Sequence, residues 1–217
     1  MVQPRIIPPV TTDSIQDRQL GSWINRIWQS LNAMEGWQHK ICPIYISGSG
    51  VNSPTWTQIG ATSFFAYAMV GTGGDFKQLW SFYQIPHDFK FETPIYPFIC
   101  WCPNTSGTGN VHWKLDYTSA KGHNQGVFNF AAPTSTTITT AAPAVQYQNM
   151  ISVAATGVSG AEPNSIIPVR WERDPANASD TYAETAFFLT TGFFYQTEGR
   201  VTTTRSPAWK KFGTLGV

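Results

Sequence analysis

From residue 41 to residue 196 the chain alternates between short apolar or Thr-rich runs and clusters of turn-forming residues. The runs include PIYIS, TWTQIG, SFFAYAMV, LWSFYQI, PIYPFICW, NVHWKLDYT, GVFNFAA, TSTTITTA, VQYQNMISVA, IIPVRWER and TAFFLTTGFFYQ. Segments such as SGSGVNSP, GTGG and NTSGTG separate them, as turns separate strands. No helical pattern lies between the runs, whereas a parallel α/β fold requires one. The pattern therefore predicts an all-β fold of about eight to eleven antiparallel strands, either a sandwich or a jelly roll.

Two of the runs differ in what their alternating faces carry. In PIYPFICWC both faces are apolar, with Tyr96, Phe98, Cys100 and Cys102 on one side and Ile95, Pro97, Ile99 and Trp101 on the other. We expect this strand to be buried on both sides or covered by another subunit. In NVHWKLDY one face is apolar and the other carries His112, Lys114 and Asp116, which predicts a half-buried strand. The Thr-rich run TSTTITTA is expected at a sheet edge or in an exposed loop.

A different pattern precedes residue 41. The first eleven residues are rich in proline and β-branched residues, which favours an extended arm. Apolar residues then follow at helical spacing and predict one amphipathic helix, which Thr12 or Asp13 caps and Gly36 ends. We assign residues 1–40 to this anchoring arm and helix and residues 41–217 to the jelly-roll domain. The expected contact residues are Ile6, Ile7 and Val10 in the arm and Leu20, Trp23, Ile24, Ile27, Trp28 and Leu31 in the helix.

The composition argues against some classes of partner and favours others. Charged residues make up 12% of the chain and aromatic residues 14%, with a formal net charge of +1. Because no Lys or Arg run supplies a positive field, nucleic acid is not expected as a partner. A surface this poor in charge can be covered by another chain, since few ions need desolvation there. The helical stripe therefore has two open interpretations, packing on its own β-domain or on a neighbouring subunit or partner shell.

Targeting signals and cysteines add little chemistry. No stretch of the sequence has the length and apolar character of a membrane span, and the start MVQPRIIPPV lacks the pattern of a signal peptide. We therefore expect synthesis in the cytoplasm and no membrane partner. The cysteine count is 3, an odd number, which predicts free thiols.

Four residues raise the possibility of a zinc site, namely Cys100, Cys102, His87 and His112. Structural zinc sites favour a longer spacer than Cys-x-Cys and a second matched pair, which the sequence lacks. His87 follows a proline and precedes an aspartate, so we expect it in a turn. The sequence predicts no metal and no cofactor.

Two carboxylate pairs raise the possibility of a glycosidase, namely Asp88 with Glu92 and Asp180 with Glu184. With so few acids in the chain, each is more readily explained as a turn cap or an arginine partner. No nucleophile elbow, zinc-protease helix or phosphate loop occurs. We predict no catalytic residue and no enzyme activity.

The densest charge lies in PVRWERDPANASDTY, with Arg170, Glu172 and Arg173 at its start. Alternation places Arg170 and Glu172 on one face of a strand. This cluster is either a solvated strand end followed by a turn or an ion-pair network between subunits.

The segments IPHDFKFETPIYPFICW, GNVHWKLDYTSA and IPVRWERDPANASDTYAETAFFLTTGFFYQTE resemble a group of small virion proteins of tailed phages. In that group an Ile/Leu-Pro-His turn precedes a strand written Pro-His-x-His-Trp, and a Val-x-Trp strand and an Arg-x-x-Arg-Asp stretch follow. The resemblance covers about residues 79 to 200. The agreeing residues are Pro86, His87, Trp101, Val111, Trp113, Leu115, Tyr117, Arg170, Arg173, Asp174, Asp180, Thr181 and Tyr182. The chain departs from the group at Phe98, Ile99 and Cys100, where the relatives have His-x-His, so a metal held by paired histidines does not carry over.

The resemblance implies a jelly-roll protein, typically a homotrimer, that decorates and cements the outside of an icosahedral capsid. The expected partner is the major capsid protein of the phage head, and the expected location is the capsid surface of the virion. The trimer-interface candidates are Tyr96, Phe98, Cys100, Trp101, Arg170, Glu172 and Arg173. Two alternatives remain open. One is a tail, collar or head-fibre component, and the other is a carbohydrate-binding jelly roll that uses Trp56, Trp80 and Trp113 for attachment to the host.

Overall fold

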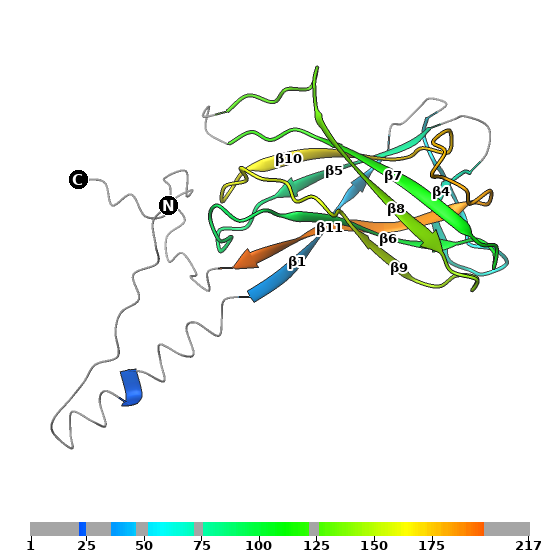
Figure 1. Cartoon of the computed structure of the whole chain (residues 1–217), viewed down its shortest axis with the longest axis horizontal. Helices are drawn as coiled ribbons and strands as arrows, with labels where there is room; N and C mark the ends of the chain where they lie inside the picture. Colours follow the sequence, from blue (N-terminus) through cyan, green and yellow to red (C-terminus); the bar gives the residue numbers. More distant parts are fainter. Residues whose placement is uncertain (1–21, 25–35, 47–51, 72–75, 122–125, 198–217) are drawn as a thin grey trace.

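A computed structural model describes residues 22–24, 36–46, 52–71, 76–121 and 126–197 of the chain. The described part is built from strands in two antiparallel sheets, which confirms the predicted all-β sandwich (Figure 1). The strands are β1 (Gly36–Cys42), β2 (Ile44–Tyr45), β3 (Thr55–Gln58), β4 (Phe65–Met69), β5 (Lys77–Gln84), β6 (Tyr96–Pro103), β7 (Gly109–Tyr117), β8 (Thr134–Ala142), β9 (Met150–Val153), β10 (Ile166–Arg173) and β11 (Ala186–Thr197).

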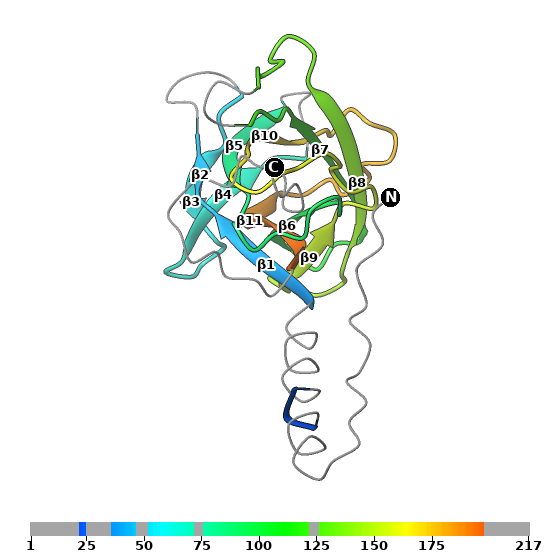
Figure 2. The same cartoon turned by 90° about the vertical axis from the view of Figure 1, so that its left-hand side faces the viewer.

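The two sheets form the two layers seen end-on in Figure 2. The first, which we call sheet A, has the order β3-β4-β11-β6-β9, and β1 also pairs with β11. The second, sheet B, has the order β2-β5-β10-β7-β8. From β4 to β11 the chain repeatedly crosses from one sheet to the other, so strands distant in sequence become neighbours.

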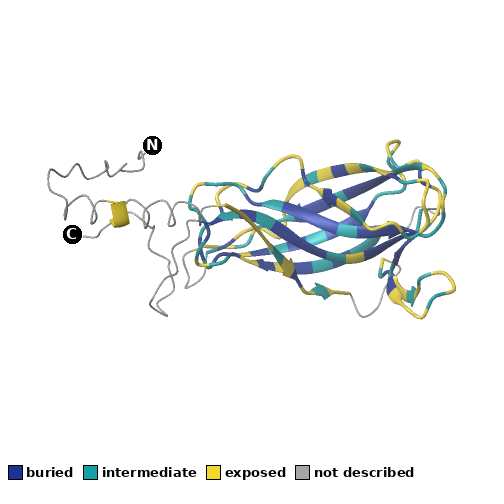
Figure 3. Ribbon diagram, turned by 90° about the horizontal axis from the view of Figure 1, so that it is seen from below, coloured by how far each residue is buried: buried dark blue, intermediate teal, exposed yellow. Residues whose placement is uncertain are grey.

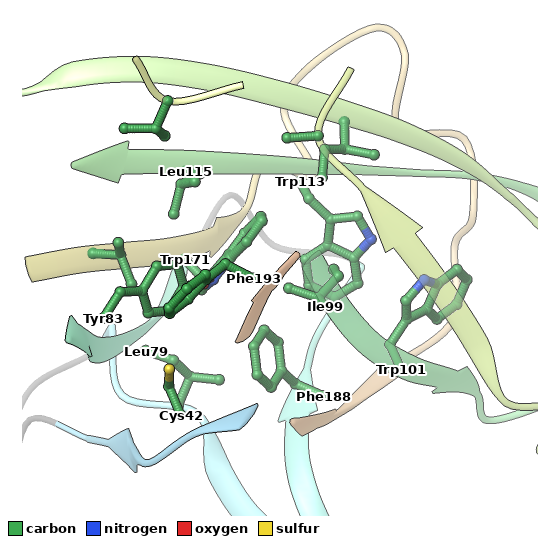
Figure 4. Close-up of a cluster of buried hydrophobic side chains, with 14 of the residues drawn as sticks. Cys42, Leu79, Tyr83, Ile99, Trp101, Trp113, Leu115, Trp171, Phe188 and Phe193 are labelled. Carbon is green, nitrogen blue, oxygen red and sulfur yellow. The ribbon is translucent and has the colours of Figure 1, made fainter. Parts of the chain in front are cut away.

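The core lies between the sheets and is filled by the inward-facing side chain of every second strand residue. Trp101 and Phe188 from sheet A meet Trp113 from sheet B, with ring centroids 5.8 Å and 6.1 Å from that of Trp113 (Figure 4). Buried indole N–H groups need acceptors, and Trp101 donates to the Ser152 hydroxyl at 2.9 Å. The large aromatic residues of the sequence therefore serve the interior first.

Several strand predictions are confirmed and two are wrong. β8, the Thr-rich run, is the edge strand of sheet B, as expected. The run GVFNFAA forms no strand: residues 126–132 make a connection between β7 and β8. The boundary at residue 40 is also wrong, because β1 begins at Gly36 and pairs along its length with β11. The alternation of apolar residues in GWQHKIC predicts a strand, but the run is short. It follows the apolar residues at helical spacing and starts at the helix-ending Gly36, so the sequence assigns residues 36–40 to the arm and helix.

Of the predicted arm and helix, residues 36–40 belong to β1, and before them the structure describes only residues 22–24, which have helical backbone. Trp23 and Ile24 belong to this turn. The other predicted contact residues lie outside the described residues: Ile6, Ile7, Val10, Leu20, Ile27, Trp28 and Leu31. Within the described part of the chain, no helix has the length and apolar character needed to cross a membrane.

Candidate functional site

The outer face of sheet A is apolar where four strands lie side by side in the order β1-β11-β6-β9. The registers bring outward-facing residues into cross-strand rows, and one row consists of Ile41, Gly192, Phe98 and Val153. The next row on one side pairs His39 with Phe194 and Tyr96, and on the other side Thr190 and Cys100 lie beside Ile151. We call this surface the apolar face; its members are Trp37, His39, Ile41, Tyr96, Phe98, Cys100, Ile151, Val153, Thr190, Gly192 and Phe194.

Several residues of the apolar face are exposed in the single chain, and Figure 3 colours the ribbon by the burial of each residue. Ile41 is 61% exposed, Ile151 56% and Trp37 54%. None of the outward-facing positions of these four strands carries Lys, Arg, Asp or Glu. Antiparallel sheets normally present polar residues on a face that water covers. A charge-free face with large exposed apolar groups is instead typical of an interaction surface.

The centre of the apolar face is packed by its own strands. The Phe98 ring lies 4.8 Å from the Phe194 ring and is only 3% exposed. Gly192 makes this possible, because a Cβ at that position would lie 2.8 Å from Phe98 Cζ and closer still to the Lys40 carbonyl oxygen. The absence of a side chain at Gly192 therefore lets the Phe98 ring approach the backbone of β11 closely.

Two cysteines of β6 lie on this side of the sheet. Cys102 is buried with Ala66, Ala68 and Phe187, and this burial raises its pKa to about 11. Cys100 is half-buried, and its pKa is also raised by burial. All three cysteines are free, as predicted. Cys100 is therefore a thiol at the middle of the apolar face whose reactivity reports whether that face is covered.

The outer face of sheet B carries charged groups as well as the exposed rings of Tyr45 and Phe82. Asp116 accepts hydrogen bonds from Ser135 and Arg170 on the neighbouring strands β8 and β10, and the Lys114 ammonium lies 3.5 Å away. Burial alone would raise the pKa of Asp116, but these hydrogen bonds and cations outweigh it and hold the pKa below its ordinary value. Farther along, Gln78 donates to Glu172 at 2.7 Å. The charged groups of this face therefore find partners within the chain.

Not every trimer-interface candidate can reach a neighbour. Trp101 is fully buried in the core, and Arg173 is fully buried beneath the loop that follows β10, so neither is available to another subunit. Alternation predicted two apolar faces for β6, and the structure shows that its Trp101 side is the core side. Tyr96 and Cys100 are half-buried, Phe98 is covered by Gly192 and Phe194, and Arg170 and Glu172 are engaged on sheet B.

Arg173 is a folding residue. Its guanidinium donates from Nε to Asp180 Oδ2 at 2.9 Å and from Nη2 to Asp180 Oδ1 at 2.8 Å. It also donates to the carbonyl oxygens of Met69, Tyr182 and Glu184. A buried ion pair whose hydrogen bonds are all made pins the loop 174–185 to the sandwich. The Arg-x-x-Arg-Asp and Asp-Thr-Tyr residues that carry the phage resemblance therefore include this pair.

The zinc residues are not brought together. Cys100 and Cys102 lie on the outer side of sheet A, whereas His112 lies on the outer side of sheet B, where its Nδ1 is 2.8 Å from Thr139 Oγ1. His87 is exposed in a turn, as predicted. Within the described ranges no three His, Cys, Asp or Glu side chains are grouped as metal ligands.

The carboxylate pairs also have structural partners. Asp88 accepts a hydrogen bond from the Thr197 hydroxyl at 3.1 Å. Asp180 is held by Arg173, and its Oδ2 also accepts from the backbone N–H of His112 at 3.0 Å. One acid of each pair, Asp88 or Asp180, is therefore engaged in contacts that stabilise the fold.

The three tryptophans proposed for carbohydrate binding differ in their exposure to solvent. Trp113 is fully buried and Trp80 is half-buried. Trp56 is 56% exposed on β3, where its ring is within 17° of parallel to that of Phe65 at a centroid distance of 6.4 Å. The Tyr67 ring lies edge-on, 4.7 Å from Trp56. Only Trp56 of the three thus belongs to an exposed aromatic surface.

Sequence reasoning missed most of the exposed residues of the apolar face. Trp37, Ile41, Ile151 and Val153 were not among the site candidates. The signal was present for β1, since the alternation of GWQHKIC puts Trp37 and Ile41 on one face. Which face points outward follows only from the pairing of β1 with β11.

Comparisons with known proteins add little. No family model matches the chain, and no curated protein matches it. Among solved structures, a carbohydrate-binding module, TmCBM61 in complex with β-1,4-galactotriose, is similar over 74% of this chain and 86% of its own, with 8% sequence identity and a TM-score of 0.22. A likeness at this level carries no argument about function.

Proposed function

We propose that this chain is a structural virion protein of a tailed bacteriophage, which binds the outer surface of the capsid as a homotrimer and stabilises the head. The observation that carries the proposal is the apolar face of sheet A, which is exposed and free of charge in the single chain. The sequence resemblance to phage virion proteins points to the same class.

The physics of such a face favours association. Burial of apolar surface contributes about 25 cal/mol per Å², and no ion of the face has to be desolvated. Three chains in one assembly present three capsid-binding segments at once, which raises the effective concentration of each after the first has bound. Contacts that are weak one at a time therefore become strong in a trimer.

The strand order supports the jelly-roll assignment within this proposal. Eight consecutive strands contribute β4-β11-β6-β9 to sheet A and β5-β10-β7-β8 to sheet B. A double-sheet jelly roll has eight strands arranged in two Greek keys. Virus capsids use this fold widely, because its outer faces are left available for contacts with other subunits.

The test is binding to phage heads that lack the protein. We expect the full-length chain to cosediment with such heads and to raise the temperature at which they open. In solution its mass should be three times the 24.1 kDa of a single chain. A variant with Phe82→Glu, an exposed change on sheet B, should behave as the wild type. Absence of head binding at micromolar protein would contradict the proposal, and binding to tails or necks in place of heads would favour the tail, collar or head-fibre alternative.

A carbohydrate-binding role is the second candidate, and Trp56 is the observation that favours it. Its ring and the Phe65 ring are nearly parallel and both more than half exposed, as a stacking surface for a sugar requires. A glycan array probed with the wild type and with Trp56→Ala decides the matter, with Phe82→Ala as the matched control. Glycan signals that are lost only in Trp56→Ala would support this role, and an array without signals would remove it.

A further inference from the structure

We infer that the apolar face of one copy is covered by the helical stripe of a second copy, with Trp23 and Ile24 seated on sheet A between Ile41 and Ile151. This inference rests on the proposed function and deepens it, because it identifies which parts of the chain join the subunits.

Two of the exposed apolar surfaces within the described residues are the two sides of this contact. One is the apolar face, and the other begins at residues 22–24, where Trp23 is 62% exposed and Ile24 38% exposed. Residues 22–24 lie apart from the sandwich in both views (Figures 1 and 2). Neither surface is therefore covered by the other within one chain.

The two surfaces match in size and in chemistry. The stripe runs in sequence from Leu20 to Leu31, which corresponds to about 17 Å along a helix. The four strands β1, β11, β6 and β9 are together about 14 Å wide between their outermost axes. The stripe positions hold only Leu, Ile and Trp, and the apolar face holds no charged residue. Contact between them buries no unpaired ion.

The connection to β1 favours a second copy over the chain's own face. Residues 32–35 join the end of the stripe to Gly36, and four residues span at most about 14 Å. Gly36 lies at the end of sheet A, where it pairs with Thr197. Residues 22–24 lie apart from the sandwich of their own chain (Figures 1 and 2), so an apolar face that they cover belongs to a second copy.

The contact also explains a closed assembly. Each copy offers one stripe and one apolar face, so the contact is heterologous, with different surfaces on the two partners. Heterologous contacts produce a ring when the rotation between copies closes. In a ring of three copies each stripe contacts the apolar face of the next copy, which agrees with the proposed homotrimer.

The first experiment compares three double variants by mass in solution. The stripe variant is Trp23→Glu with Ile24→Glu, the face variant is Ile41→Glu with Ile151→Glu, and the control is Tyr45→Glu with Phe82→Glu. The control residues are 49% and 50% exposed and belong to strands of sheet B. We expect the wild type and the control to have three times the mass of one chain, and the stripe and face variants to have the mass of one chain. Thermal unfolding of each variant shows that it is folded.

The second experiment mixes the two dissociated variants. The stripe variant keeps an intact face and the face variant keeps an intact stripe, so a mixture should form two-chain complexes that neither variant forms alone. A stripe that covers its own face would give no complex in the mixture. That result, or a stripe variant that keeps the mass of the wild type, would overturn the inference.

Cys100 gives a readout at the centre of the face. In the wild type its alkylation should be slower than in either dissociated variant by about tenfold or more, since a covered thiol is not reached by the reagent. Equal rates would contradict coverage of the face.

The two proposals can fail separately. If the face variant dissociates and the stripe variant stays assembled, the face is an interface with another occupant, and this inference fails while the proposed function stands. If the variants behave as expected and the wild type does not bind phage heads, the proposed function fails and this inference stands.

Discussion

The outer faces of the two sheets differ in the residues that they present. Sheet B presents charged groups that are paired within the chain, and part of sheet A presents exposed apolar groups. On sheet B, the Asp116 carboxylate meets Arg170 and Ser135, and Glu172 meets Gln78, so polar groups are paired across neighbouring strands. On sheet A, Ile41 and other large apolar groups are exposed, and no outward position of β1, β11, β6 or β9 carries a charged residue. Both sheets are antiparallel, and their outward residues differ in kind. The comparison teaches that sheet B pairs its charged groups within the chain, whereas the face formed by β1, β11, β6 and β9 of sheet A exposes large apolar groups and carries no charge.

The difference has an energetic basis. A buried or half-buried charge is stabilised by its partners, and a second chain placed over it would have to remove the remaining water at a cost. An exposed apolar group makes no hydrogen bonds to water that would be lost, so its burial under another chain lowers the free energy. One protein can thus keep one outer face towards solvent and present the other to its partners.

The largest expected effect is on sheet A, at Phe98. Replacement by alanine empties the place that this ring fills between Gly192 and Phe194, and we expect a loss of about 3 kcal/mol in the free energy of unfolding. Urea unfolding of the dissociated stripe variant measures this without a contribution from association. Phe82→Ala, at a ring that is 50% exposed, should cost less than about 1 kcal/mol. Equal losses at the two sites would mean that Phe98 is not packed by its own sheet.

The next effect is on sheet B, at Asp116. Asp116→Ala removes the acceptor of both Ser135 and Arg170, and we expect a loss of about 2 kcal/mol, moderated by the partial exposure of Arg170. The measurement is again the free energy of unfolding. Lys114→Ala serves as the control because the ammonium lies farther from the carboxylate, at 3.5 Å, and is partly exposed. A loss at Lys114 as large as at Asp116 would argue against the paired network.

A smaller effect concerns pH. The pKa of Asp116 is held below its ordinary value in the folded protein, so in acid the folded chain binds fewer protons at this site than the unfolded chain. Its contribution to stability is therefore complete above the unfolded value of about 3.9 and is lost as the pH falls through the folded value. We expect the difference in unfolding free energy between the dissociated chain and its Asp116→Asn variant to shrink below about pH 4. A difference that stays constant down to pH 2 would contradict this assignment.

The smallest effect is expected at the rim of the apolar face. Ile151 is 56% exposed, so Ile151→Thr should change the unfolding free energy of the dissociated chain by less than about 0.5 kcal/mol. The same change should weaken association in the otherwise unmodified protein, visible as a concentration-dependent mass. A large loss of stability in the dissociated chain would show that Ile151 supports the fold and not the contact.

Much of this architecture could be predicted from the sequence. The alternation of NVHWKLDY correctly placed Val111, Trp113 and Leu115 in the core, because a period of two on a half-buried strand leaves little choice. The two-sided run around Phe98 was correctly recognised as unusual. The inward direction of Trp101 was not predictable, because both faces of that strand are apolar and only the opposing sheet distinguishes them.

The candidate site was harder to predict, for a physical reason. Apolar residues usually point inward, so Trp37 and Ile41 read as core residues if β1 is recognised at all. Their exposure depends on the pairing of β1 with β11, which are about 150 residues apart, and long-range pairing leaves no local signal. Arg173 was placed at the surface for the same reason, since its partner Asp180 belongs to a loop that folds back over it.

The pairing of Gly36 with Thr197 means that the sandwich starts and stops at a single pole. A short peptide bridge between these two residues would turn the eleven strands into a closed loop of chain, and new ends could be opened at the far pole, for example in the turn at residues 104–108. A fusion partner attached beside Gly36 or Thr197 would extend from the same pole of the sandwich. An insertion at the 104–108 turn would extend from the opposite pole, so one chain could carry two fused domains that stay apart.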